Sequence, residues 1–373
     1  DVDILLSRVI YPTNQIMWYR NDGSGAFSSM GVVASSNDSG YWVEAGDVDG
    51  DGDADIITSR ATNNNDILWY PNNGIGTFSP AIVAMSGSTD YIERARVADL
   101  NMDGREDICY VDGDKDIRLV LTDPNGFQPP VLLYSAAIFN LNGDLRLADM
   151  DANGSTDVVF CDNNALIGYF PNPGDGAFPT TPDTLIPNPW ASIGDPFITA
   201  DMDNNGLLDI VVGAPSALAY FPDEGWNTVF PPRLLSRAMS AADLLMGDLD
   251  QDGDADALSI ASYGYSLHGS GLLAAKNDGT GVFARPDTIS SLAMDFGFGF
   301  GPWHLHDVDE DGDPDILLLE NRSGPAHLGW LVNNGSGYFD SSVVLLSGTR
   351  YYELVDLDQD GRKSGIRRSI ANG

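Results

Sequence analysis

The chain has 373 residues and is strongly acidic, with 55 Asp and Glu against 19 Lys and Arg and a formal charge of −36. This charge balance argues against a protein that binds nucleic acid or an anionic membrane surface, because binding to either one needs clustered basic residues. The 41 Gly and 21 Pro residues indicate many turns, and the 43% of hydrophobic residues suffices for a core. No apolar stretch approaches the ~20 residues of a membrane helix, so we expect no membrane insertion.

The chain starts at Asp1, without a starter methionine or a signal peptide, and we therefore expect a processed or trimmed product. Cys109 and Cys161 can form at most one bridge, which excludes a disulfide scaffold. We expect both to be small buried residues on strands.

One acidic pattern recurs seven times along the chain. It reads Asp, any residue, Asp or Asn, any residue, Asp or Asn, Gly, two further residues and Asp, and we number these positions 1 to 9. Successive copies start 47 to 59 residues apart. A period near 50 residues is typical of a repeat architecture. The copies are 47–55, 99–107, 149–157, 201–209, 248–256, 307–315 and the incomplete 356–361.

The predicted elements keep the same order in each unit. A short apolar run such as 56–57 follows the acidic loop, and an aromatic run such as 67–70 comes next. That run ends in an Asn-x-Gly turn, which supplies the positive φ angles of a tight hairpin. Two more apolar runs, such as 82–84 and 96–97, lead to the next loop. Four short strands per unit without helical periodicity predict a blade of a β-propeller.

The two ends of the chain complement each other. Residues 1–7 match 53–59 almost one for one, so the chain starts partway through a repeat, and 356–361 supply the missing loop. We therefore predict an all-β, seven-bladed propeller closed by pairing of the N- and C-terminal strands in one split blade. Residues 1–361 would form one domain, and 362–373 a basic tail or linker. Alternatively, the tail completes the last blade.

The acidic loops have the composition of a site for a hard cation. Alternate carboxylates lie on one side of a tight turn, Gly at position 6 permits the bend, and position 7 can offer its backbone carbonyl. Such a flexible oxygen ring suits Ca²⁺ better than Mg²⁺. Zinc is disfavoured because the loops lack Cys and His. Position 12 is not acidic in any complete copy, which separates these loops from EF-hands.

The loops, together with aromatic runs of the form Trp-Tyr-x-Asn-x-Gly-x-Gly-x-Phe, resemble the VCBS / FG-GAP repeat family, which includes the integrin α-subunit head. The resemblance covers about residues 1–361 and implies a Ca²⁺ ion between the first and second strands of each blade. Asn101, Asn153 and Asn205 keep an oxygen ligand but lose a charge. The last site would borrow Asp3 from the opposite terminus. The predicted ligands, with position 7 acting through its carbonyl, are Asp47, Asp49, Asp51, Asp53, Asp55; Asp99, Asn101, Asp103, Arg105, Asp107; Asp149, Asp151, Asn153, Ser155, Asp157; Asp201, Asp203, Asn205, Leu207, Asp209; Asp248, Asp250, Asp252, Asp254, Asp256; Asp307, Asp309, Asp311, Asp313, Asp315; and Asp356, Asp358, Asp360 with Asp3.

Up to seven structural Ca²⁺ ions favour a secreted or cell-surface protein. Extracellular calcium modules bind at roughly 10⁻⁴–10⁻³ M, which a cytosol with sub-micromolar calcium does not reach. At ten times the dissociation constant each site adds ~1.4 kcal/mol, so seven sites add about as much as the net stability of a domain.

Other residues leave alternatives open. His304 and His306 would face the same side of a strand, either as an acid/base pair or as partly buried strand residues. Trp18, Trp69 and Trp330 recur at one repeat position, which favours blade packing, although platforms for stacking sugars between blades are the alternative. Insertions in the longest repeat, such as 296–301, would form either a binding surface or decoration.

The leading functional interpretation is a binding or adhesion module for an extracellular protein or glycan, without enzymatic activity. The alternatives are a polysaccharide-active enzyme of the lyase type that uses a central cleft, and a structural subunit of an extracellular assembly. The fold does not decide among them, and the sequence leaves the oligomeric state open.

Overall fold

The computed structural model describes most of the chain as strands, turns and loops, and no described residue lies in a helix. Accordingly, the described part contains no helix that is able to cross a membrane. Residues 359–373, which include the predicted ligand Asp360 and the expected tail, lie outside the described residues. The described ranges are 2–10, 13–36, 42–60, 65–88, 92–113, 116–135, 145–161, 166–187, 197–214, 217–223, 233–236, 244–261, 270–294, 303–320, 326–339 and 343–358.

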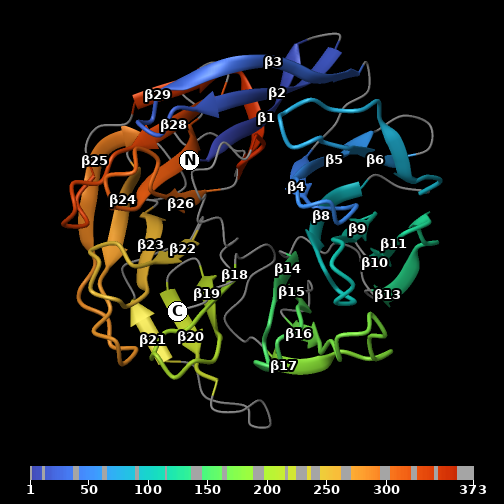
Figure 1. Ribbon diagram of the computed structural model, residues 1–373. Helices are drawn as coiled ribbons and strands as arrows, with labels where there is room; N and C mark the ends of the chain where they lie inside the picture. Colours follow the sequence, from blue (N-terminus) through green and yellow to red (C-terminus); the bar gives the residue numbers. More distant parts are fainter. Residues whose placement is uncertain are drawn as a thin grey trace. The chain divides into compact units, whose positions relative to one another are not determined.

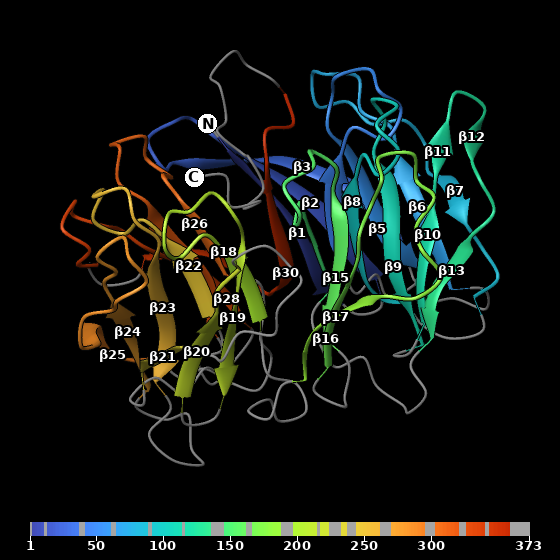
Figure 2. The same cartoon turned by 90° about the horizontal axis from the view of Figure 1, so that it is seen from below.

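The strands form seven four-stranded antiparallel sheets, which confirms the predicted seven-bladed β-propeller (Figures 1 and 2). By their contacts the residues divide into two compact units. The first comprises Asp1–Asn163, Ile167–Thr184 and Arg350–Arg367, and the second comprises Asn164–Leu166, Leu185–Thr349 and Arg368–Gly373. The single domain expected for residues 1–361 stays a prediction.

Four blades belong to the first unit, and we number them in the order of their second strands. Blade 1 contains β30 (Thr349–Val355), β1 (Asp3–Ile10), β2 (Thr13–Asn21) and β3 (Phe27–Ser36). Blade 2 contains β4 (Val43–Gly46), β5 (Asp55–Arg60), β6 (Asp66–Tyr70) and β7 (Ile82–Met85). Blade 3 contains β8 (Ile92–Ala98), β9 (Asp107–Asp112), β10 (Asp116–Val120) and β13 (Val131–Ser135), with the extra hairpin β11 (Thr122–Asp123) and β12 (Gly126–Phe127). Blade 4 contains β14 (Leu145–Ala148), β15 (Asp157–Cys161), β16 (Leu166–Phe170) and β17 (Asp183–Pro187).

Three blades belong to the second unit. Blade 5 contains β18 (Phe197–Ala200), β19 (Asp209–Ala214), β20 (Ala217–Phe221) and β21 (Arg233–Ser236). Blade 6 contains β22 (Leu244–Gly247), β23 (Asp256–Ala261), β24 (Ser270–Ala275) and β25 (Asp287–Met294). Blade 7 contains β26 (His304–His306), β27 (Asp315–Glu320), β28 (His327–Leu331) and β29 (Val343–Ser347).

Blade 1 is the predicted split blade, because β30 near the C-terminus lies beside β1 in the same sheet. In blades 2 to 7 the acidic loop connects the first strand to the second, and in blade 1 it follows the first strand, β30. In every blade the Asp at position 9 is the first residue of the second strand. The repeat therefore places the same carboxylate at the same point of each blade.

The core lies between neighbouring blades. In the first unit Trp42 and Ile57 of blade 2 pack with Val97 and Tyr110 of blade 3, and all four are buried. Each blade buries its apolar residues against the adjacent blade, so every repeat needs apolar residues at the same positions. Cys109 and Cys161 are buried and on strands, as expected, and no disulfide joins them.

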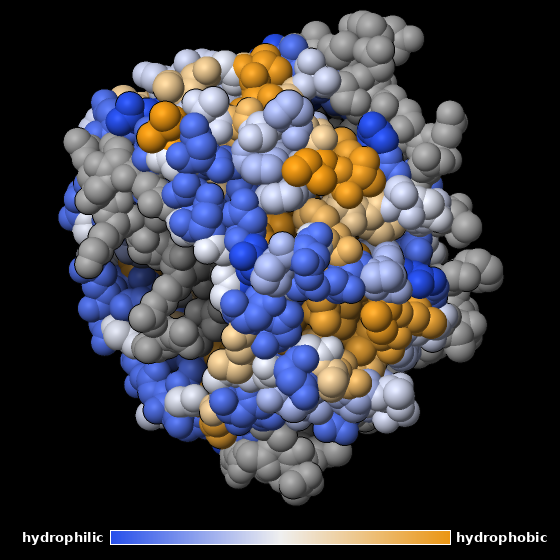
Figure 3. Space-filling model, turned by 45° about the vertical axis from the view of Figure 1, so that its right-hand side comes forward, coloured by the Kyte–Doolittle hydropathy of each residue, from blue (hydrophilic) through white to orange (hydrophobic). Residues whose placement is uncertain are grey.

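The outermost strands are less well covered. Ile82 and Val83 on β7, and Val131 and Leu132 on β13, are exposed. Figure 3, which brings the side of β13 forward, shows hydrophobic surface there among hydrophilic patches. These strands lie at the edge of their sheets and have no neighbouring strand on one side. Their apolar side chains are therefore exposed on a surface that is otherwise charged.

Trp18 fixes the packing of blade 1 on blade 2. Its side chain is buried, and a Cβ on Gly76, in the hairpin that follows β6, would overlap its ring. Gly76 also has a φ of 70°, in the left-handed region that favours glycine. Burial of this indole favours the packing interpretation over a sugar platform at this position.

We predict that Gly76→Ala destabilises the protein by about 2–5 kcal/mol, because the methyl group adds overpacking against Trp18 to the cost of a left-handed alanine. Gly87→Ala is the matched control: Gly87 has a φ of 84°, but its Cβ would meet no atom within 4 Å. Urea unfolding should show a loss of only about 1–2 kcal/mol for the control. Equal losses for both variants would show that the contact with Trp18 contributes nothing.

Candidate metal centres

The acidic loops share one backbone conformation. The carboxylate at position 1 accepts hydrogen bonds from the N–H groups of positions 5 and 6, as Asp47 does from Asp51 and Gly52, both at 3.0 Å. Position 6 is a glycine with positive φ in each of the six loops whose geometry is described to that point. Position 4 also has positive φ in these loops, and only Gly50 is a glycine there. A left-handed conformation costs a non-glycine residue roughly 1–2 kcal/mol, and such strain concentrates at functional sites.

The loops bring the acids of positions 1, 3 and 9 together. In at least five loops one oxygen from each lies within 4.8 Å of the other two. Three carboxylates at this spacing repel one another unless a proton or a cation lies among them. These groups are Asp3, Asp356, Asp358; Asp47, Asp49, Asp55; Asp149, Asp151, Asp157; Asp201, Asp203, Asp209; and Asp248, Asp250, Asp256.

The carboxylate at position 9 is the buried member of each group. Asp55, for example, is fully buried and accepts hydrogen bonds from the N–H groups of Val48 and Asn72, at 3.2 and 2.7 Å. The indole Nε1 of Trp69 donates a third bond at 2.8 Å, and Trp18 makes the same contact with Asp3. Three donors orient the carboxylate and leave its remaining lone pairs directed elsewhere.

Burial raises the pKa of all seven position-9 acids above the ordinary value of 3.8. The pKa rises to about 7 for Asp55, Asp157 and Asp209, and to about 6 for Asp3, Asp107, Asp256 and Asp315. Removal of the charged form from water dominates each shift, and the hydrogen bonds oppose it. Without a cation these carboxylates therefore retain protons more readily than ordinary acids.

The acid at position 3 shows best that a cation fits. Asp49, Asp203, Asp250 and Asp309 each have an Oδ1 that is buried and accepts no hydrogen bond. An unpartnered anionic oxygen is costly unless a cation lies beside it. The side-chain atoms of the cluster that could bind a metal are all oxygens, which suits a hard divalent ion. The residues present therefore fit a metal such as Ca²⁺.

Positions 5 and 7 lie differently. In all six loops described at these positions, the side-chain oxygen of position 5 accepts the N–H of position 7, as Asp51 does from Asp53 at 3.0 Å. Position 7 itself contacts neighbouring groups: Arg105 donates to the carbonyl of Asp49, and Ser155 donates to the sulfur of Met102 at 3.4 Å. These contacts leave the predicted role of the position-7 carbonyls open.

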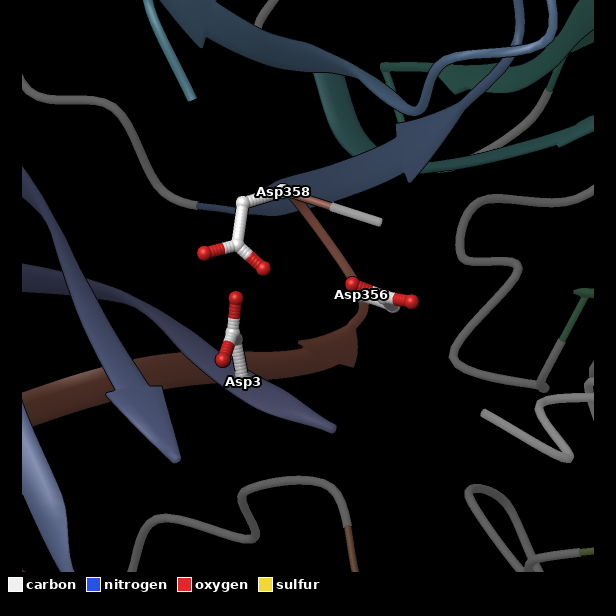
Figure 4. A group of neighbouring side chains, drawn as sticks. All are labelled: Asp3, Asp356 and Asp358. Atoms are coloured by element: carbon white, nitrogen blue, oxygen red, sulfur yellow. The ribbon is translucent and has the colours of Figure 1, made fainter. Parts of the chain in front are cut away.

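The split site is assembled from both ends of the chain. Asp3 starts β1, whereas Asp356 and Asp358 follow β30, and Figure 4 shows the carboxylates of Asp3 and Asp358 facing one another. Asp358 contributes to the raised pKa of Asp3, after burial. Arg20 forms an ion pair with the Oδ2 of Asp358 at 3.0 Å, which offsets part of this repulsion.

The hairpin asparagines have a role between blades that was not predicted. Asn72, Asn172, Asn277 and Asn333 each donate from Nδ2 to a carbonyl of their own blade and to one of the preceding blade. From the sequence these asparagines were interpreted only as turn-forming residues. Their recurrence 15 to 21 residues after the position-9 Asp is the sequence signal that could have indicated a further role.

The histidines of β26 are half-buried. Burial lowers the pKa of His306 to about 4, so its imidazole is neutral near pH 7 and lacks the extra proton of the imidazolium form that acts as a general acid. This geometry favours the interpretation as strand residues over an acid/base pair.

Comparison with known proteins agrees with this architecture. A family model described as FG-GAP-like repeat matches residues 1–58 and 149–212. No curated protein matches.

Solved structures match over most of their length. A lectin from Agrocybe aegerita, described as recognising non-reducing terminal N-acetylglucosamine, aligns with a TM-score of 0.72 and 20% identity over 96% of both chains. The BP39L lectin from Burkholderia pseudomallei aligns with a TM-score of 0.65 and 12% identity over 92% of this chain and 95% of that one. The periplasmic gluconolactonase of Pseudomonas aeruginosa aligns with 0.56 and 11% over 95% and 99%. At these identities the likeness shows the fold alone. The matched repeats and the seven four-stranded blades together support an FG-GAP-like β-propeller.

Proposed function

We propose that this protein is an extracellular, calcium-stabilised propeller that binds glycans without converting them. The observation that carries the calcium part is the buried, unpartnered Oδ1 at position 3, which recurs in four loops. Bound Ca²⁺ would place a positive charge beside these unpartnered oxygens. The acids of positions 1, 3 and 9 would hold it, and the backbone of each loop would fix the turn between two strands.

Glycan binding is supported by the likeness to two lectins along nearly the whole chain. The same fold also occurs in a gluconolactonase, so the fold is compatible with catalysis. The neutral, half-buried His306 gives no support to a general acid. We therefore favour binding, and turnover is an outcome that the experiment must detect.

The calcium part of the proposal predicts the effect of metal removal. Calcium at ten times its dissociation constant adds about 1.4 kcal/mol per occupied site, which corresponds to roughly 2 °C in Tm for a chain of this length. Millimolar CaCl₂ added after EDTA should raise Tm in differential scanning calorimetry by several times this amount, and MgCl₂ should raise it less. Asp309→Asn should remove about one site's share. The control Asp278→Asn, at an exposed hairpin acid, should retain the full response.

Equal transition temperatures in EDTA and in calcium would overturn the metal part of the proposal.

A further prediction concerns pH in the absence of metal. The seven position-9 acids have folded-state pKa values of about 6 to 7, against ~3.9 in the unfolded chain. Between pH ~4 and ~7 the folded state therefore binds more protons, and the free energy of unfolding rises as pH falls. The lowered pKa of His306 changes the free energy of unfolding in the opposite direction, but His306 is one group against seven.

In EDTA, the urea midpoint should increase from pH 8 to pH 5. With excess calcium the trend should reverse, because protons then compete with the ion for the same carboxylates. A metal-free protein that loses stability over this interval would contradict the assignment of these acids as destabilised anions.

A separate prediction tests the ligand. A glycan array probed with calcium-loaded protein should show binding to a restricted set of sugars, and EDTA should weaken that binding. The bound sugars should be recovered unchanged by mass spectrometry. Cleaved or unsaturated products would replace binding with catalysis, and an array without signal in calcium would remove the glycan part of the proposal.

A further inference from the structure

Asn277 connects two neighbouring acidic loops of the second unit. Its Nδ2 donates to the carbonyl of Met202, at position 2 of the loop in blade 5, at 2.9 Å. Its backbone N–H donates to Oδ1 of Asp256, the position-9 acid of blade 6, at 2.8 Å. One residue therefore contacts the loop of one blade and the predicted metal ligand of the next.

The same connection continues into blade 7. The N–H of Leu249, at position 2 of the loop in blade 6, donates to Oδ2 of Asp256 at 3.1 Å. The carbonyl of Leu249 accepts from Nδ2 of Asn333 at 3.2 Å, and the N–H of Asn333 donates to Asp315 at 2.8 Å. All these residues are buried, so water does not compete for the bonds.

A second set of contacts joins the same loops at the surface. The amide of Asn204, at position 4 in blade 5, donates to Asp254, at position 7 in blade 6, at 2.5 Å. Gln251, at position 4 in blade 6, donates to Asp313, at position 7 in blade 7, at 2.6 Å. Blades 5, 6 and 7 are thus linked loop to loop by two independent routes.

We infer that the hairpin asparagines are positioning residues that couple calcium binding in neighbouring blades, so that an occupied loop raises the affinity of the next one. This inference rests on the proposed calcium binding. Position 2 lies between the ligands at positions 1 and 3, so closure of a loop around its ion fixes the position-2 carbonyl. That carbonyl holds the asparagine amide, and the asparagine N–H orients the position-9 acid of the next blade. The second loop then has less freedom to lose when it binds.

The described contacts show which neighbouring blades an asparagine connects. In the first unit Asn72 joins blade 2 to the carbonyl of Leu357 in blade 1 at 2.8 Å, and Asn172 joins blade 4 to Leu100 in blade 3 at 2.8 Å. Blade 3 has Thr122 at the equivalent position. Its hydroxyl donates at 3.1 Å to the carbonyl of Glu106 within its own blade, and its N–H still bonds Asp107. Threonine therefore preserves the contacts within a blade.

The test is a double-mutant cycle in the full-length protein. Asp201→Asn combined with Asp203→Asn weakens the loop of blade 5. Hydrogen–deuterium exchange of peptides that cover 248–256, measured across a CaCl₂ titration, gives the calcium midpoint of the loop in blade 6. The cycle is completed in the Asn277→Thr background, for which blade 3 supplies the natural precedent. Thr280→Ala, at the tip of the same hairpin, is the control.

With Asn277 present, weakening blade 5 should raise the midpoint of blade 6 at least ~5-fold, the lower end of usual coupling between sites. In the Asn277→Thr background the same change should shift it less than about 2-fold, whereas Thr280→Ala should retain the full shift. A calcium midpoint in blade 6 that does not respond to the weakening of blade 5 would overturn the coupling, and an equal shift in both backgrounds would overturn the role of Asn277 in it.

Asn333→Thr, with Asp248→Asn and Asp250→Asn, repeats the cycle for blades 6 and 7, so the inference can be tested even if Asn277→Thr does not fold. Failure of the proposed function gives a different result, because no acidic loop would then gain protection from exchange in CaCl₂.

Discussion

The structure depends on one buried carboxylate per blade, at the first residue of the second strand. Asp55 shows how it works: its two oxygens bind the N–H of Val48 in the acidic loop and the N–H of Asn72 in the hairpin. The carboxylate thereby joins the turn that precedes β5 in the sequence to the turn that follows β6. The same charge is costly to bury, which is why its pKa rises to about 7. Each blade therefore contains a strong organising contact that also requires a compensating positive charge.

The loop geometry is consistent with that requirement. Five residues other than glycine have positive φ at position 4, Met102 and Glu310 among them, and each pays a conformational cost. Hydrogen bonds from the loop backbone to the position-1 acid hold this shape, and in four loops the Oδ1 of the position-3 acid, such as Asp309, is left without a donor. A strained backbone and an unsatisfied anion in the same few residues make little sense for a plain turn. They are expected of a turn whose folding is completed by a bound ion.

Much of this was predictable from sequence because the repeat is periodic and its key residues are local. The seven loops, the four strands per blade and the pairing of β1 with β30 all follow from spacing and from the match between the two ends of the chain. The contacts between blades were not predictable in this way. Asn277 bonds the carbonyl of Met202, 75 residues earlier, and a turn motif gives no information about a partner so far away in the sequence. The indole of Trp69 was likewise recognisable as packing, whereas its bond to Asp55 depends on the register of two strands.

The blades also differ in ways that bear on how they respond to calcium. Lys276 forms an ion pair with Oδ2 of Asp250 at 2.7 Å, and Arg20 does the same with Asp358, whereas Pro71 and Val332 occupy the equivalent place before the hairpin Asn in blades 2 and 7. A fixed cation on the outer oxygen offsets part of the repulsion within its cluster, and it also weakens the attraction of that cluster for a second cation. The loops with such a cation are less destabilised when empty and gain less when filled. The sites are therefore not equivalent, although their backbones are, and any coupling between blades acts on calcium affinities that differ from loop to loop.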